Sequence, residues 1–206
     1  FGFQPSLLSD IRDESLTSGL RFSWGEWDFD LSNTLGQNTF EYTVENSNNV
    51  SLGVDSPTTF DAGGHQFFQD VVNASANRYY GKVFEGLNIA LGAEYRYESY
   101  EINAGEEASY IDGGAQSFPG FSPLNEVSKN RNNISFYVDT EADLTDGFLI
   151  GLAGRFESYS DFGETVNGKI TSRYEVTEKL SFRSAVSTGF RAPSVQQRFF
   201  NNISTD

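Results

Sequence analysis

The 206-residue sequence contains no cysteine and no methionine, and it has a single histidine. The lack of cysteine excludes structural disulfides, thiolate metal sites and cysteine nucleophiles. No nucleophile motif accompanies the one histidine, His65, so a Ser-His-Asp triad has no support. Because position 1 is not methionine, we expect the chain to be a piece of a longer protein.

Basic residues are also scarce, since 14 Lys and Arg stand against 29 Asp and Glu, and the formal net charge is -15. An acidic chain repels phosphate, so we expect no nucleic-acid partner. Long apolar runs are missing as well, because no stretch of about 18 apolar residues occurs, and a transmembrane helix is therefore not predicted.

Alternation of apolar and polar residues is the strongest pattern in the chain. In residues 133–144 the even positions are mostly apolar, as at Ile134 and Phe136, whereas the odd positions are mostly polar, as at Ser135 and Asp139. A two-residue repeat predicts a strand with one apolar and one polar face. The repeat predicts eight strands, near residues 20–24, 27–44, 65–80, 87–103, 133–144, 148–157, 166–176 and 180–190.

The connections between these strands fall into two classes. Short turns are expected near 25–26, 82–86, 145–147 and 177–179, and long connections rich in Gly, Asn and Ser at 45–64 and 104–130, with a shorter one of the second class at 160–163. Tight turns at one rim and longer loops at the other are typical of transmembrane barrels. Strands such as 27–44 exceed the about 9–11 residues that cross a bilayer. We therefore predict an all-β fold, an antiparallel up-and-down meander that forms part of a transmembrane β-barrel wall.

The two faces of the predicted strands differ in chemistry. The apolar face is expected to meet outer-membrane lipid, and it carries Ile134, Phe136, Val138, Phe148, Ile150, Leu152, Val166, Ile170, Tyr174, Phe182 and Val186. The polar face has charges of both signs, as a barrel lumen does. Its lumen-facing candidates are Glu94, Arg96, Arg155, Arg173, Arg183 and Arg191. A soluble antiparallel sheet with one solvated face would show the same alternation.

One segment of the chain carries a recognisable motif. Residues 180–205, LSFRSAVSTGFRAPSVQQRFFNNIST, resemble the mid-barrel segment of TonB-dependent outer-membrane receptors, in which STGFRAPS is a recurrent signature. Residues 138–180 look like the preceding barrel strands of that family. Residues 86–121, GLNIALGAEYRYESYEINAGEEASYIDGGAQSFPGF, are similar to a strand and extracellular loop of the subgroup common in Bacteroidetes. Pro193 cannot donate to a sheet ladder, so the wall is expected to end near Phe190.

The resemblance implies a transport function without enzymatic activity or a cofactor. Receptors of this family sit in the outer membrane of Gram-negative bacteria and import scarce nutrients such as siderophores, cobalamin or glycans. Their 22-stranded barrel is filled by a plug domain, and the TonB complex supplies the energy through the plug region. We recognise no plug, TonB box or C-terminal aromatic-ending strand, so residues 1–206 are expected to be a partial barrel domain. Isolated, the fragment is expected to self-associate, because a large apolar face is not tolerated in water.

Loop residues supply the remaining site candidates. Tyr110, Phe118 and Phe121 lie in an aromatic-rich loop that could contact the unknown nutrient, although a self-packing loop is the alternative. Acidic segments at 105–107 and 160–164 could hold Ca²⁺ through oxygen ligands. Solvated acidic loops are the preferred explanation, so no metal site is assigned.

Two other functions stay open at this point. One is a complete eight-stranded outer-membrane barrel with a structural or adhesive role, since eight strands suffice to close. The other is a soluble β-sandwich that binds carbohydrate on its aromatic residues.

Overall fold

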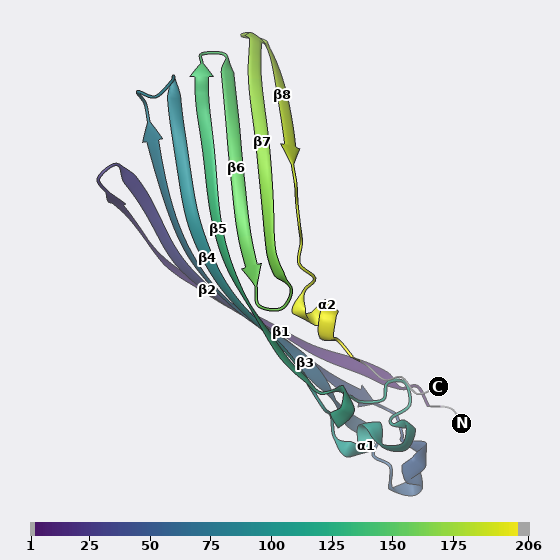
Figure 1. The fold of residues 1–206 in the computed structure, drawn as a ribbon. Helices are drawn as coiled ribbons and strands as arrows, with labels where there is room; N and C mark the ends of the chain where they lie inside the picture. Colours follow the sequence, from purple (N-terminus) through teal and green to yellow (C-terminus); the bar gives the residue numbers. More distant parts are fainter. Residues whose placement is uncertain (1–2, 202–206) are drawn as a thin grey trace.

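The computed structural model describes residues 3–201 and consists of a single antiparallel sheet (Figure 1). Each strand pairs with its neighbours in the chain, in the order β1 to β8. The predicted meander of eight strands is thereby confirmed. The strands are β1 Ser6–Trp24, β2 Trp27–Glu45, β3 Thr59–Tyr80, β4 Gly86–Asn103, β5 Val127–Thr145, β6 Phe148–Tyr159, β7 Gly163–Thr177 and β8 Leu180–Ser187.

The sheet is open within the described residues, because β1 and β8 are edge strands that do not pair with each other. This differs from the closed eight-stranded barrel that the strand count alone allows. A second sheet packed on the first, as a sandwich needs, is not found in residues 3–201 either.

Short turns and long loops lie at opposite ends of the sheet. The hairpin turns that join β1 to β2, β3 to β4, β5 to β6 and β7 to β8 gather at the upper end in Figure 1. The other end carries the short helical elements η1 Val50–Asp55, α1 Glu107–Tyr110, η2 Ile111–Gly113, η3 Pro123–Asn125 and α2 Val195–Phe199. None of the helices in the described part of the chain is long and apolar enough to cross a membrane.

Strand length changes abruptly across the sheet. The five strands β1 to β5 have 18 to 22 residues each, whereas β6, β7 and β8 have 12, 15 and 8. The first five strands therefore project well past the β6–β7 turn, as Figure 1 shows.

Strand register sorts the side chains onto two faces, because directly paired residues point to the same side. One row of pairs runs Leu20, Leu31, Ala74, Ala93, Phe136, Phe156 and Val166 across seven strands. We call this face outer and its opposite inner. All the apolar-face residues predicted from the sequence share the outer face, and many are widely exposed, Val166 at 76% for example. We call the apolar band the apolar residues of the outer face that lie level, in the strand register, with residues 87–97 of β4.

Four strand boundaries differ clearly from the sequence-based expectation. β5 begins at Val127, inside the connection predicted for 104–130. β1 begins at Ser6 rather than near residue 20, and β3 begins at Thr59, inside the connection predicted for 45–64. The alternation around Ile11 is too irregular to predict a strand, yet β2 supplies a complete pairing partner. β8 ends at Ser187, before the predicted end near Phe190.

A β-bulge explains the early part of β3. Gly64 pairs with Glu41, but Asp61 pairs with Thr43, so β3 holds one residue more than β2 over this interval. Gly63 has a φ of 78°, and a Cβ there would lie 2.4 Å from a backbone oxygen of the neighbouring strand. Only glycine meets both demands.

The hydrophobic core lies at the loop-bearing end. Two buried clusters form there, one with Val44, Phe60, Ala62 and Ala115, the other with Tyr100, Ile102, Phe121 and Val195. We call this end the rim; it comprises the loop-side ends of β2 to β5 with residues 46–58, 104–126 and 188–200. The remainder of the sheet, up to the short turns, is called the wall.

Candidate functional site

An ion-pair network lies on the inner face of the wall. The Arg155 guanidinium contacts Glu94 Oε1 at 3.3 Å and Glu157 Oε1 at 3.0 Å, and Arg96 contacts Glu94 at 3.0 Å. The carboxylates are more enclosed than the arginines, since Glu94 is 12% exposed and Arg155 is 34% exposed. The structure thus brings together three of the predicted lumen-facing residues, from β4 and β6.

The other predicted lumen-facing arginines lie apart from this network. Arg173 and Arg183 are direct cross-strand partners on the same inner face, and Arg173 Nε contacts Glu175 Oε1 at 3.5 Å. Two cations opposite each other repel, so Glu175 partly offsets the pair. Arg191 lies in the segment beyond β8, which ends at Ser187, so its lumen-facing position stays a prediction.

A second charged group, at the loop-side ends of β4 and β5, is almost completely buried. Arg131 Nε donates to Glu98 Oε2 at 2.8 Å, and Nη2 donates to the same oxygen. Sequence reasoning missed Arg131 because the strand was predicted to begin only at residue 133. The odd residue number was the available signal, since the odd positions from 127 to 143 face inward on β5.

Aromatic side chains form the inner surface of the rim. His65 stacks on Phe40 with ring centroids 4.9 Å apart and lies 5.8 Å from Tyr100. The Tyr42 hydroxyl is 3.3 Å from His65 Nε2. We call Phe40, Tyr42, His65, Tyr100, Phe118, Phe121 and Phe200 the aromatic cluster, whose members approach one another within 6.4 Å.

Burial sets the protonation of this cluster. It lowers the pKa of His65, so the imidazole is neutral at pH 7. Burial also raises the pKa of Tyr42, and burial together with the neighbouring Tyr42 raises the pKa of Tyr100 to about 12. Both hydroxyls therefore stay protonated. The Tyr100 hydroxyl is buried and finds no partner among the described residues.

The three predicted ligand-contact residues have different environments. Phe121 is only 2% exposed and belongs to the rim core. Phe118 packs edge-on against Phe121 at 5.8 Å and lies 5.7 Å from Tyr42. Tyr110, at the end of α1, is half-buried. The packing of Phe118 and Phe121 favours the self-packing loop, while contact of these residues with a ligand stays a prediction.

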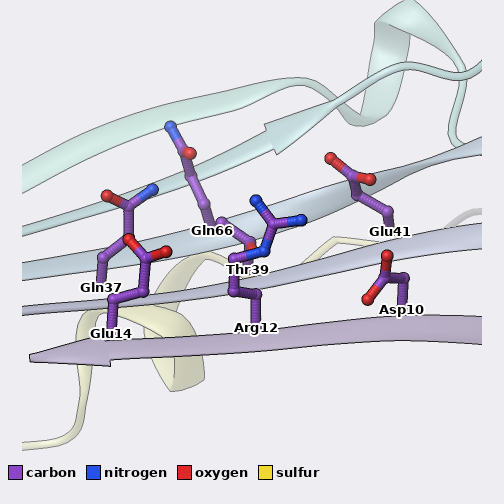
Figure 2. Close-up of a pocket in the computed structure, with 7 residues that line it drawn as sticks. All are labelled: Asp10, Arg12, Glu14, Gln37, Thr39, Glu41 and Gln66. Atoms are coloured by element: carbon purple, nitrogen blue, oxygen red, sulfur yellow. The ribbon is translucent and has the colours of Figure 1, made fainter.

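A polar groove occupies the outer face beyond the apolar band. It encloses about 280 Å³ and is lined by Asp10, Arg12, Glu14, Gln37, Thr39, Glu41 and Gln66 (Figure 2). Glu14 pairs with Gln37 directly after the pair Leu16–Leu35, so the surface turns from apolar to polar within two residues. This change marks the end of the apolar band on β1 and β2.

The acidic loop segments are engaged with protein groups. The Glu106 carboxylate accepts a hydrogen bond from the Asp61 backbone at 3.2 Å, and Asp161 pairs with Arg198. Within residues 3–201, no three or more His, Asp or Glu side chains gather so that they could hold a metal ion.

The sheet, its apolar band and its elaborated rim agree with a comparison of the whole sequence. The family model described as "TonB dependent receptor-like, beta-barrel" matches residues 1–206. The chain belongs to the TonB-dependent receptor family. Members of this family are outer-membrane proteins that import small-molecule ligands and engage TonB. No curated protein matches the chain.

Solved structures of TonB-dependent receptors share the fold. The ferric enterobactin receptor PfeA of Pseudomonas aeruginosa superposes with a TM-score of 0.67 at 14% identity, over 92% of this chain and 26% of that one. The siderophore receptor PirA of Acinetobacter baumannii gives 0.65 at 13% identity, over 90% and 26%. The RagAB peptide transporter gives 0.64 at 9% identity, over 85% and 21%. The chain thus spans about a quarter of the length of these structures.

Proposed function

We propose that the chain is a wall segment of an outer-membrane receptor that imports a scarce nutrient with energy from TonB. The domain is partial in this proposal, with a plug domain and further strands elsewhere in the same protein. Lipid covers the outer face, and TonB acts through the plug.

One observation carries the proposal: the outer face has a band of apolar side chains whose height suits a bilayer. On β4 this band runs from Leu87 to Tyr97, which matches the about 9–11 residues that a barrel strand needs to cross. Beyond it the same face becomes polar, and the inner face bears ion pairs. A water-soluble sheet has no reason to confine exposed apolar residues to a band of this height.

The nutrient belongs to the siderophore, cobalamin, glycan or peptide classes in this proposal. The fold neighbours are by their titles siderophore receptors and a peptide transporter, which supports the breadth of that range. The exposed side of Tyr110 and the accessible members of the aromatic cluster, Phe118 and Phe200, are the parts of this chain that an incoming solute meets first.

We also propose that this segment is not an enzyme. His65 is enclosed by aromatic rings, and the polar group at its Nε2 is the Tyr42 hydroxyl, whose pKa is raised rather than lowered. A histidine base works best with a pKa near the operating pH, and burial moves the pKa of His65 away from it.

Uptake measurements on the intact receptor test the import function. A strain lacking the receptor is complemented with the parent, with Tyr110→Ala or with Tyr79→Ala, an exposed tyrosine at the turn end that serves as the matched control. Uptake of a ferric siderophore, cobalamin, an oligosaccharide and a peptide is followed with surface levels measured in parallel. We expect one class to depend on the receptor and Tyr110→Ala to weaken its capture. Equal uptake of all four with and without the receptor would refute import.

The isolated fragment gives a second test. Its apolar band has no lipid in aqueous buffer, so we expect residues 1–206 to self-associate and to disperse in detergent. Light scattering after size-exclusion chromatography reports the mass. A monodisperse monomer without detergent would contradict the assignment of this band to lipid.

A further inference from the structure

The segment after β8 leaves the wall and folds back across its inner side. Residues 188–200, which we call the strap, run from β8 past the β6–β7 turn to α2, and α2 contacts β4 and β5 (Figure 1). The strap contains the GFRAPS motif of residues 189–194, to which the proposed import function assigns no role.

Apolar contacts fix the strap at two points. Phe190 lies 5.4 Å from Phe162 of the β6–β7 turn, and Phe162 stacks on Tyr159 at 4.3 Å. Farther along, Val195 is completely buried in the cluster that contains Tyr100 and Phe121. The Ser194 hydroxyl accepts a hydrogen bond from the Gln197 backbone and caps α2 at this position.

The third attachment is a charged hydrogen bond from the wall. Arg131 Nη1 donates to the backbone carbonyl of Pro193 at 2.7 Å, while Nε and Nη2 of the same guanidinium donate to Glu98. The side chains of Arg131 and Glu98 are only 5% and 9% exposed. Arg131 Nη1 also lies 4.0 Å from Asp161, which pairs with Arg198 of the strap.

Burial makes these contacts depend on one another. A buried ion pair is tolerated when its remaining donors are hydrogen-bonded, and it becomes costly when they are not. The Pro193 carbonyl satisfies a guanidinium group that Glu98 leaves free, so the docked strap completes the pair. The pair in turn holds the strap at a backbone atom, so the side chain of residue 193 is irrelevant to the contact.

We infer that Arg131 is a positioning residue that keeps the strap docked on the inner face and thereby shapes the ligand-facing rim. The strap carries Phe200 into the aromatic cluster, 6.4 Å from both His65 and Phe121. Release of the strap removes Phe200 from that cluster. This role rests on the proposed import function only where it concerns the ligand; docking of the strap stands by itself.

Cysteine labelling measures docking without reference to transport. The chain has no cysteine, so Val195→Cys introduces one reporter of nearly unchanged size into it. Intact receptor free of other reactive thiols is treated on whole cells with a maleimide–polyethylene glycol reagent. Labelling is slow while residue 195 is buried and fast once the strap leaves.

Four backgrounds are compared. Arg131→Met removes all three hydrogen bonds, and Glu98→Gln with Arg131→Met also removes the carboxylate that the single change leaves unpaired. Arg131→Lys keeps the positive charge but lacks the planar guanidinium with its several N–H donors. Arg173→Met is the matched control, since its partner Glu175 is on the wall and exposed.

We expect labelling to accelerate roughly tenfold or more in both Arg131→Met backgrounds, as expected for loss of a hydrogen bond to a charged group. Arg131→Lys should fall between, and Arg173→Met should match the parent. The double variant decides the matter if the single one fails to assemble. Parent-like labelling in the double variant would overturn the positioning role.

Uptake kinetics separate this inference from the proposed function. With the strap released, we expect the nutrient concentration for half-maximal uptake to rise while maximal uptake per surface receptor changes less. Faster labelling with unchanged uptake kinetics would keep the docking role and overturn the link to the ligand. If no nutrient is imported at all, the labelling experiment still tests whether Arg131 holds the strap in place.

Discussion

The wall and the rim are made of the same strands but are stabilised in different ways. All the buried hydrophobic residues of the described chain lie in the rim, with the exception of Ala142. The wall is a single layer whose apolar side chains are exposed on one face and whose charges are on the other. A layer of this kind needs lipid outside and further protein or water inside, whereas the rim carries its own core.

Charged groups show the same contrast. In the wall, Arg155 and Arg173 keep about a third of their side chains exposed, at 34% and 39%. In the rim, Arg131 is nearly enclosed, and each of its three guanidinium nitrogens donates a hydrogen bond. Exposed pairs contribute little to stability, and buried pairs are costly to break. Substitutions should therefore have unequal effects in the two regions.

The largest effect is expected for Phe121→Ala in the rim. Removing a fully buried aromatic side chain costs about 3–5 kcal/mol, and here the loss falls on the packing of residues 104–126 against β4 and the strap. Limited proteolysis on whole cells should show faster cleavage of this loop, with unchanged surface levels. Ser128→Ala, an exposed position on β5, is the control. Loss of the receptor from the surface would show that wall and rim are not independent.

A charge in the apolar band comes next. Leu152 lies on the outer face of β6 within the apolar band, opposite Ile170, and Leu152→Arg places a cation against lipid, at a cost that reaches about 2–4 kcal/mol at the midplane. Thr171→Arg, on the inner face of β7, is the matched control. Folding titrations of the intact receptor in lipid vesicles should show destabilisation for the first variant alone. Equal effects would mean that the outer face does not meet lipid.

Acid should loosen the rim and spare the wall. The folded state lowers the pKa of His65 below about 6.5, its ordinary value, so the unfolded rim binds the proton more readily. Stability is then retained above pH 6.5, falls as the pH drops below it and levels off under the folded pKa. Tyr42 and Tyr100 stay protonated in this range. Cleavage of residues 46–58 at pH 5.5 should exceed that at pH 7.5, and His65→Phe should abolish the difference.

The smallest effect is expected for Arg173→Gln on the inner wall. The change breaks a half-exposed pair with Glu175 and relieves repulsion from Arg183, so the net change should stay below about 1 kcal/mol. The same vesicle titration measures it. A large loss would mean that the wall charges are shielded from water in the complete receptor.

The wall was predictable from sequence because its alternation is regular. Apolar residues recur at every second position in Ile134, Phe136 and Val138 and in Phe148, Ile150 and Leu152, and the structure places them on one face. Short turns were visible for the same reason, as the alternation stops and resumes across 146–147.

The rim was less predictable because its contacts are not periodic. At Gly63 the bulge reverses the parity of β3, so a strict two-residue repeat ends there and Thr59–Ala62 were assigned to a loop. Arg131 and Pro193 are brought together by the path of the strap, which no local pattern encodes. The aromatic loop was recognised, but its partner Val195 lies far away in the chain.

The path of the strap also fixes an order in time. Every strand pairs with its neighbour, so the hairpins can be added one after another, each by closing a short loop. The contact between Arg131 and Pro193 joins positions 62 apart and requires β4, β5 and the β6–β7 turn to be in place beforehand. We therefore expect the strap to dock only after these hairpins have formed during assembly.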